Sequence, residues 1–319
     1  MQGLYAVFTK ELQDHFSSFR FAILFALIAM VSFITSYMAA IHLSENLENL
    51  SSTRFPFLTL FSTPGAVFSM VQFVAFFGPL IGLVLGFDAI NRERAQGTLI
   101  KVVSQPIYRD AVINGKFLAG VATISIMLTS IVLVITGFGL AIVGVVPGVG
   151  EIGRLIIYLV ISIFYVSFWL GLSILFSILL KSVATSALTS VALWIFLSFF
   201  VTLGAEAVAN SVAPVDPNKN VQPEMVIRNA KIKKMVSLCS PMVLYNDATA
   251  TIIDPIRNTT RSLVLMGPME ELLSSRFQNP LALTQSILVV LPYITVLIAI
   301  TLVCFTVSYL VFMLQEIRT

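Results

Sequence analysis

The sequence predicts an all-α integral membrane protein with six transmembrane helices, and three observations lead to this prediction. Of 319 residues, 57% are hydrophobic and only 11% are charged, whereas typical soluble domains have about 25% charged residues. The apolar residues gather in six runs, and about 20 such residues are enough to cross a bilayer. A cluster of cations separates the second run from the third. So few charges could not cover the surface of a soluble fold, so we expect a multi-pass protein of the cell membrane.

The six expected spans are each bounded by charged residues or by a turn signal, such as Pro147-Gly148 after the third. None carries a charged side chain in its interior. Backbone groups in lipid need internal hydrogen bonds, so runs of this kind should be helices. The expected spans cover residues 21–41, 67–87, 117–145, 155–180, 183–205 and 286–314.

The cations indicate how these spans are oriented. Five of them lie in the connection 88–116, which we call the strip: Arg92, Arg94, Lys101, Arg109 and Lys116. Lysine and arginine concentrate in short cytoplasmic loops. With six spans, the strip shares its side with both termini, which we therefore expect to be cytoplasmic. Segment 206–280 then lies outside despite its eight Lys/Arg residues, because loops longer than about 60 residues largely escape this rule.

An amphipathic helix is expected before the first span. Apolar residues recur at spacings of three and four between residues 4 and 19, while Lys10, Glu11 and Asp14 fall between them. Such a helix lies along a membrane interface. It either anchors the N-terminus or uses its polar face to help hold a cytoplasmic partner.

The chain divides into three parts in this interpretation. Residues 1–205 hold the interfacial helix, five spans and the strip, residues 206–280 form an extracytoplasmic cap, and residues 281–319 form the last span and a cytoplasmic tail. Within the cap, short helices are expected at 227–238 and 268–277, where proline and two glutamates suit a helix start. Cys239 should face outside and Cys304 should be buried in the sixth span, so no disulfide is expected between them.

Motifs for enzymatic chemistry are missing from the sequence. There is no HExxH and no GxSxG, which argues against a zinc protease and a serine hydrolase. Gly115-Lys116 looks like the end of a phosphate loop, but Phe117 replaces the needed Ser/Thr and Asp110 stands where the first glycine should be. We therefore expect no catalytic residue, no metal site and no cofactor in this chain.

Polar groups inside the spans bear on a carrier function. Ion-coupled carriers usually keep a charged residue within the membrane, and the nearest candidate here is Asp88, which we expect to be an interfacial carboxylate near Arg92. Gln72 is a possible pathway residue. A self-contained channel or secondary carrier is the alternative function, and a membrane anchor or sensor is a third.

The strip itself has a pattern beyond its charge. Residues 93–103 are expected to form an amphipathic helix with Gly97 inside it, ended by Pro106. On the residues alone this helix could be a mere topology signal. The order Glu93-x-x-x-Gly97-Thr98-Leu99, then Ser104-x-Pro106, Arg109 and Gly115-Lys116 resembles the cytoplasmic coupling region of ABC-2 type permeases, the membrane subunits of ABC exporters. The order of interfacial helix, spans, strip and outer segment resembles them as well.

The resemblance implies a homodimer of permeases with two cytoplasmic ATPase subunits, which would bind ATP and Mg. The strip would pass their motion to the spans. Segment 206–280 resembles the subgroup that includes the permease of nitrous-oxide-reductase maturation, although no Met- or His-rich cluster supports a copper role. Membrane lipid is an expected partner and nucleic acid is not, while drug, peptide, lipid and ion-delivery roles all fit. The implied partner-binding residues are Arg92, Glu93, Arg94, Gly97, Thr98, Leu99, Ser104, Pro106, Arg109 and Lys116.

Overall fold

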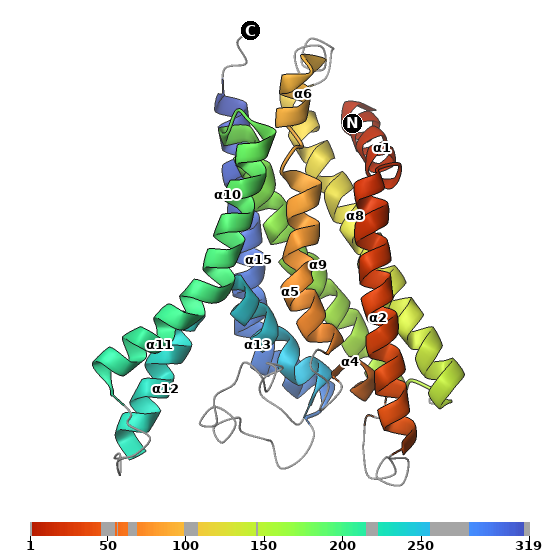
Figure 1. Ribbon diagram of the computed structural model, residues 1–319, viewed down its shortest axis with the longest axis vertical. Helices are drawn as coiled ribbons and strands as arrows, with labels where there is room; N and C mark the ends of the chain where they lie inside the picture. Colours follow the sequence, from red (N-terminus) through yellow and green to blue (C-terminus); the bar gives the residue numbers. More distant parts are fainter. Residues whose placement is uncertain are drawn as a thin grey trace.

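The computed structural model describes residues 2–45, 55, 57–62, 69–98, 108–144, 146–214, 223–255 and 281–315. Every element in these ranges is helical (Figure 1). Five helical stretches are long and apolar enough to cross a membrane, and a bent pair near the N-terminus adds a sixth if it counts as one span. The predicted fold class, an all-α membrane protein, is confirmed.

The five long stretches run through most of the labelled helices in Figure 1. They are α5 (Met70–Gly86) with α6 (Asn91–Ala95), α8 (Arg109–Phe138) with the π-helical turn η1 (Gly139–Val143), α9 (Val149–Leu179), α10 (Val183–Ile195) continued by η2 (Phe196–Phe200) and α11 (Val201–Val212), and α15 (Leu283–Leu314). Other short helices are α4 (Thr59–Ser62), α12 (Pro223–Ser237) and α13 (Pro241–Ile253).

The bent pair consists of α1 (Gln2–Phe16) and α2 (Phe19–Glu45). The two axes differ in direction by 62°. Two serines separate them, and the Ser18 hydroxyl accepts a hydrogen bond from the backbone N–H of Arg20 at 3.3 Å. Serine suits this place because its side chain satisfies a free N–H at a helix start. The bend directs α1 away from the axis of α2, as the predicted interfacial helix requires.

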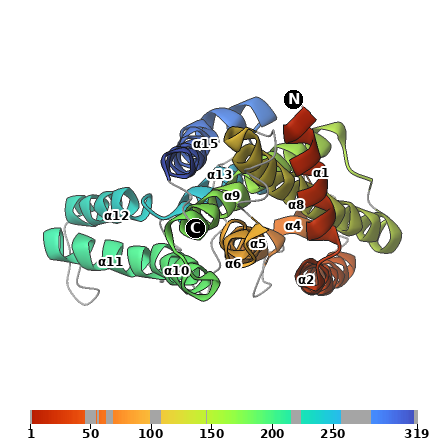
Figure 2. The ribbon, with the colours of Figure 1, turned by 90° about the horizontal axis from the view of Figure 1, so that it is seen from above.

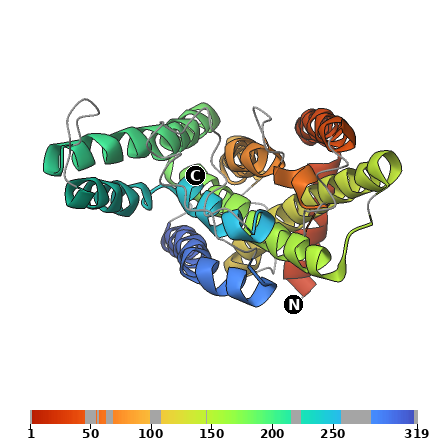
Figure 3. The same cartoon turned by 90° about the horizontal axis from the view of Figure 1, so that it is seen from below.

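Helix α9 lies at the centre of the bundle, with α5, α8 and α15 around it (Figures 2 and 3). Helix α5 approaches α9 closely because Gly82 has no side chain, and a Cβ there would lie 2.5 Å from the carbonyl oxygen of Val166. Small residues allow this backbone approach in membrane helices. The Tyr165 hydroxyl donates to the carbonyl of Ala75 at 2.6 Å, which fixes the same pair of helices.

Several span boundaries differ from those predicted. The third span ends at Val143, where Gly144 adopts a left-handed φ of 70°, before the expected Pro147-Gly148 turn. The fifth continues to Val212 rather than 205. The fourth begins at Val149 instead of 155, so Glu151 and Arg154 lie inside a helix and are buried. Arg154, which precedes the expected start of this span, is therefore not a loop cation, and its hydrogen bonds explain why burial is tolerated.

Arg154 joins α9 to two later parts of the chain. Its guanidinium donates to the carbonyls of Thr251 and Ile252 at the end of α13, at 3.1 and 3.2 Å. It also donates to the carbonyl of Leu281 at 2.6 Å and to the Ser286 hydroxyl at 3.0 Å. Cations suit helix C-termini because the last carbonyls there have no partner in the helix. Arg154 thus fixes α13 and α15 on α9.

Segment 206–280 contains an element that is packed into the bundle. Helix α13 contacts α5, α9 and α15, and all but one of its 13 residues are buried. The expected surface helix at 227–238 corresponds to α12, which lies beside α11 (Figure 1). Ser162 and Tyr245 share a hydroxyl hydrogen bond of 2.9 Å. The helix expected at 268–277 lies outside the described residues.

The two ends of the bundle carry different elements (Figure 1). Helices α1 and α6 and the C-terminus lie at one end, which we call the α6 end. Helices α4, α12 and α13 lie at the other, which we call the α13 end. This agrees with the predicted sharing of one side by both termini and the strip.

Candidate functional site

Four charged side chains form an ion cluster at the α6 end: Lys10, Glu11, Glu93 and Lys116. The Lys116 ammonium lies 2.8 Å from Oε1 of Glu11 and 2.9 Å from Oε1 of Glu93, and only 4% of its side chain is exposed. Glu11 belongs to α1, Glu93 to α6 and Lys116 to α8. The cluster therefore joins three helices that lie up to 105 positions apart in the sequence.

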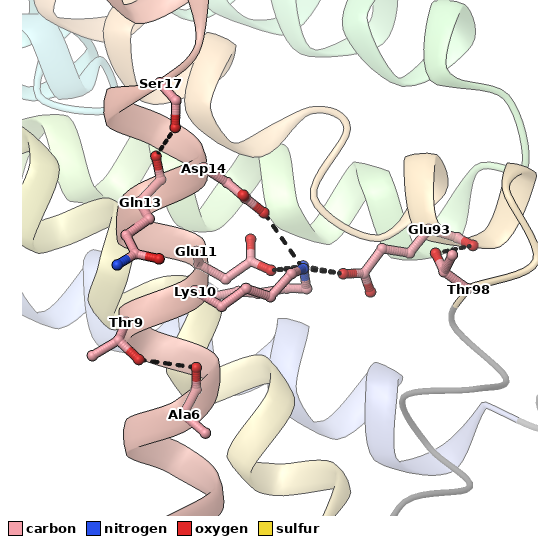
Figure 4. A network of polar contacts seen from close by, with 10 residues as sticks. Ala6, Thr9, Lys10, Glu11, Gln13, Asp14, Ser17, Glu93 and Thr98 are labelled. Carbon is pink, nitrogen blue, oxygen red and sulfur yellow. Dashed lines mark hydrogen bonds and ion pairs between the residues drawn. The ribbon is translucent and has the colours of Figure 1, made fainter.

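Lys10 closes the cluster from its exposed side. Its Nζ lies 3.0 Å from Glu11, 3.4 Å from Glu93 and 3.5 Å from Asp14. Figure 4 shows these carboxylates reaching toward Lys10. Burial alone would lower the pKa of Lys10, but the Glu11 carboxylate raises it above its usual value. Burial would raise the pKa of Glu11, yet the Lys116 ammonium lowers it, so both groups stay charged near neutral pH.

Gly115 explains how α1 comes so close to α8. A Cβ on Gly115 would lie 2.7 Å from Cγ1 of Val7 and 2.9 Å from its Cβ. Val7 is itself buried in α1. The missing side chain at Gly115 lets α1 lie against α8, and this places Glu11 within reach of Lys116.

A second ion pair connects the start of α2 to the end of α5. The Arg20 guanidinium lies 2.5 Å from Oδ2 of Asp88 and 5.4 Å from the centre of the Phe87 ring. Asp88 lies one helical turn before Arg92, whose backbone N–H donates to the Asp88 carbonyl at 3.0 Å, but the Asp88 carboxylate pairs with Arg20. The aromatic face beneath Arg20 favours this orientation of the guanidinium.

Helix α6 is shorter than the predicted helix. It ends at Ala95, and Gly97 has a left-handed φ of 67°, so the predicted helix is interrupted at Gly97, and its residues 99–103 lie outside the described residues. Nothing lies within 4 Å of a Cβ built on Gly97. Glycine is favoured there because L residues rarely adopt this φ, and the Thr98 hydroxyl then donates to the Glu93 carbonyl at 3.2 Å.

The start of α6 is held by α9. The Ser177 hydroxyl accepts hydrogen bonds from the backbone N–H groups of Ile90 and Asn91, at 2.9 and 3.1 Å. Asn91 is fully buried. These bonds fix the first turn of α6 on the central helix, so α6 is in contact with α9 at its start and with the ion cluster through Glu93.

Two cations of the strip bind the end of the last span. Arg94 donates to Oε1 of Gln315 at 2.9 Å, and Arg109 donates to the carbonyls of Phe312 and Gln315 at 3.0 and 2.8 Å. Arginine near a helix C-terminus satisfies free carbonyls. The strip is thus tied to both the N-terminal helix and the C-terminal helix.

The structure brings together only part of the predicted site. Lys10, Glu11, Asp14, Glu93 and Lys116 meet in or beside the ion cluster. Leu99, Ser104 and Pro106 lie outside the described residues. Arg92 on α6 and the left-handed Gly97 just after α6 are both exposed. The partner-binding role expected for the strip stays a prediction, although the Glu93 side chain is only 12% exposed and binds the two lysines.

Gln72 lies far from this cluster, at the beginning of α5. Its side chain accepts from the backbone N–H of Ser69 at 3.0 Å, and the Ser69 hydroxyl accepts from the N–H of Gln72 at 3.3 Å. This is a capping box, which satisfies free N–H groups at a helix start. The arrangement gives Gln72 a structural role, and its pathway role stays a prediction.

Sequence reasoning missed two contributors to the α6 end. Arg20 was treated only as a cation that bounds the first span, and His15 was not connected to any site. Burial lowers the pKa of His15, with Glu11, Asp14 and Asp88 opposing this effect and Lys116 adding to it. Its place one helical turn after Glu11 is the signal that could have placed it near the cluster. Within the described ranges, no group of three or more His, Cys, Asp or Glu could hold a metal ion.

The fold and the site define a multi-pass helical membrane protein with an ion cluster at its α6 end. The sequence profile of the ABC-2 family transporter proteins matches residues 5–316. The chain therefore belongs to the ABC-2 family, and the resemblance described above is confirmed.

Two curated relatives are each described as "Probable ABC transporter permease protein NosY". The one from Pseudomonas aeruginosa is 40% identical over 91 residues, which are 28% of this chain and 31% of the relative. The one from Stutzerimonas stutzeri is 35% identical over 97 residues, which are 30% of this chain and 33% of the relative. The chain thus spans about a third of the length of these relatives.

Proposed function

We propose that the chain is the transmembrane permease subunit of an ABC exporter. In this proposal it forms the translocation pathway, while a separate cytoplasmic ATPase subunit binds ATP and Mg and supplies the energy. Membership of the ABC-2 family supports the proposal, as do the relatives described as ABC transporter permeases. The chain itself is expected to have no ATPase site.

The observation that carries the coupling role is the position of α6 within the ion cluster. Glu93 on α6 binds Lys116 on α8, and Lys116 binds Glu11 on α1. The first turn of α6 is also bound to α9 through Ser177. A partner that moves α6 must therefore displace α1 and α8, or break these bonds. Packed helices with discrete alternative contacts suit this kind of transmission.

In this proposal, the residues that contact the ATPase differ from the residue that transmits its motion to the other helices. Ala95 at the end of α6 and the next residues, Gln96 and Gly97, are exposed, so they and the following part of the strip are the proposed contact with the ATPase. Glu93 is buried and faces inward. We therefore assign Glu93 to transmission, and refine the earlier expectation that it contacts the partner directly.

The test compares two variants of α6 expressed together with an ABC ATPase subunit. Ala95→Trp adds bulk on the exposed face and should abolish co-purification of the ATPase. Glu93→Gln keeps the exposed face and should retain the ATPase, but it should reduce substrate-stimulated ATP hydrolysis. Lys181→Gln is the matched control, because Lys181 is an exposed cation outside the cluster. If both α6 variants bind and hydrolyse as the unaltered pair does, the strip is only a topology signal.

A second test, with the purified chain alone, distinguishes an exporter subunit from a self-contained channel or carrier. The exporter proposal expects no ATP hydrolysis above a mock preparation, and no flux in vesicles that lack the ATPase. Flux without the ATPase would favour a self-contained channel or carrier. A second permease copy is part of the proposal as well, and the mass of the purified complex should correspond to two chains of this protein and two ATPase subunits.

The orientation in this proposal places both termini and the α6 end in the cytoplasm. Cys239 is exposed and Cys304 is buried. Cys239 follows α12 at the α13 end, so a membrane-impermeant maleimide added to intact cells should label Cys239 and leave Cys304 unlabelled. Denatured protein, in which both thiols react, is the control. Labelling of Cys239 only after permeabilisation would reverse the orientation.

A further inference from the structure

A cavity of about 570 Å³ opens at the α6 end, between α1 and α2 on one side and α5 and α6 on the other. Ligand sites usually have volumes of about 300–1,000 Å³. The lining has two parts. Phe21, Val84, Leu85 and Ile174 supply an apolar floor, and most of the other lining residues are charged or polar. The charged ones are four cations and four carboxylates, and the polar ones include Gln96 and Thr98.

Two lining groups of opposite charge lack a partner. Oε2 of Glu93 has no hydrogen-bond donor among the described residues, although the residue is 9% exposed and its other oxygen binds Lys10 and Lys116. The side chain of Arg92 makes no hydrogen bond or ion pair within the part of the chain that the structure describes, and it is exposed. A buried carboxylate oxygen without a donor is costly, so the cavity suits a ligand that brings one.

We propose that this cavity binds the headgroup of a zwitterionic phospholipid with a primary ammonium, of the phosphatidylethanolamine class. The phosphate binds the Arg92 guanidinium, which matches phosphate geometry. The ammonium donates to Oε2 of Glu93. The equal numbers of cations and carboxylates in the lining favour a ligand without net charge over an anionic lipid.

The apolar floor of the cavity contacts the acyl chains of the ligand. Phe25 stacks on Phe21 with ring centres 5.9 Å apart, and so extends the apolar surface from the cavity along α2. Acyl chains lie along this surface while the headgroup stays with the charges at the end of the bundle. The lipid bridges α2 and α6, and this assignment does not depend on the exporter proposal.

The test measures lipid binding to the purified full-length chain by native mass spectrometry. Short-chain phosphatidylethanolamine, phosphatidylcholine and phosphatidylglycerol are compared, with free O-phosphoethanolamine as a headgroup without chains. Choline has no N–H donor and glycerol has no ammonium. We therefore expect phosphatidylethanolamine to bind about ten-fold more tightly than the other two lipids, as one charge-assisted hydrogen bond would give. Free phosphoethanolamine should bind more weakly than the lipid.

Two variants locate the site. Arg92→Gln should weaken phosphatidylethanolamine binding by about ten-fold, and it should fold because Arg92 is exposed. Glu93→Gln should reduce the preference for phosphatidylethanolamine over phosphatidylglycerol. Lys181→Gln, an exposed cation that does not line the cavity, should bind all three lipids as the unaltered chain does. Equal affinity for the three lipids, or an Arg92→Gln variant that binds like the unaltered chain, would overturn the assignment.

Discussion

Both ends of the bundle bury charged side chains, but the two ends satisfy these charges differently. At the α6 end, Lys116 binds two carboxylates, so oppositely charged side chains pair directly with one another. At the α13 end, the two buried charged residues of α9 bind mainly backbone groups, although Asp247 of α13 pairs with Lys234 at 2.9 Å. Arg154 donates to main-chain carbonyls, and Glu151 accepts from the backbone N–H groups of Phe57 and Gly148 at 2.9 and 2.8 Å.

This difference predicts different mobility at the two ends. Side chains that bind one another can exchange partners or titrate while their helices stay intact. Backbone groups at helix ends cannot change their places without unwinding the chain. We therefore expect the α6 end to be the part that moves during a working cycle, while the α13 end keeps α9, α13 and α15 in fixed contact.

The strongest test of the comparison is Arg154→Met. It leaves the carbonyls of Thr251, Ile252 and Leu281 without this donor in a buried place, and it should lower the free energy of unfolding by about 4 kcal/mol. Thermal unfolding in detergent measures the change. Arg154→Lys is the control and should recover only part of the loss, because a lysine cannot reproduce the planar set of donors. A Met variant as stable as the unaltered chain would show that the α13 end does not depend on this residue.

Lys116→Met is the corresponding test at the α6 end. It leaves the Glu11 and Glu93 carboxylates close together with only the more exposed Lys10 as a shared cation, which should cost about 3 kcal/mol. Adding Glu11→Gln should recover stability, because it removes one of the two like charges. Lys181→Met is the exposed control. If the double variant is less stable than Lys116→Met alone, the repulsion argument is wrong.

A smaller effect is expected at Gly97. Leucine at the observed φ of 67° should cost about 1–2 kcal/mol, whereas asparagine tolerates this conformation better. Gly97→Leu should therefore lower the unfolding temperature more than Gly97→Asn. Equal unfolding temperatures for the two variants would mean that the left-handed turn is not required.

The smallest expected effect is the pH dependence of the stability that the α6 end contributes. Burial lowers the pKa of His15 from 6.5, so folding favours the neutral imidazole and stability declines as the pH falls below 6.5. The pKa of Glu11, despite the opposing effect of burial, is lowered from 4.5 by Lys116, so its contribution is complete above pH 4.5 and is lost as the pH falls further.

Thermal unfolding measured across this range separates the two groups. His15→Gln should remove the loss of stability that begins below pH 6.5 (the upper decline) and leave the loss below pH 4.5. Glu11→Gln should remove the loss below pH 4.5 and leave the upper decline. The same upper decline in the unaltered chain and in His15→Gln would assign it to another group.

Much of the fold could be predicted because a membrane span is a long local signal. An uncharged run of sufficient length identifies each span regardless of its neighbours, and the three-and-four spacing of apolar residues identifies α1 in the same way. Helix α13 could not be recognised as part of the bundle. It is too short to cross a bilayer, and it carries Asn246 and Asp247, whose burial is acceptable only because other elements supply partners. One of these is Lys234, which lies 2.9 Å from Asp247.

The sequence could predict which charged residues belong to the candidate site, but not which of them pair with one another. The sequence shows charges in α1 and in the strip, yet nothing local pairs Lys116 with Glu11 across 105 positions. The spacing of Glu93 and Lys116 likewise does not show that the carboxylate faces inward. The sequence analysis placed Gly97 inside a helix, and the local sequence did not reveal the left-handed φ of 67° that this glycine adopts.

The hydrogen bonds of Gln315 have a consequence for how the protein is made. All members of the ion cluster precede residue 117, so the cluster can form early during synthesis. Arg94 and Arg109, in contrast, bind Gln315 and Phe312, which are synthesised more than 200 residues later. Until then the strip keeps these two cations without their final acceptors, as a signal of incomplete assembly that a quality-control protease or chaperone could read. Nascent chains that stop before α15 would present that signal permanently.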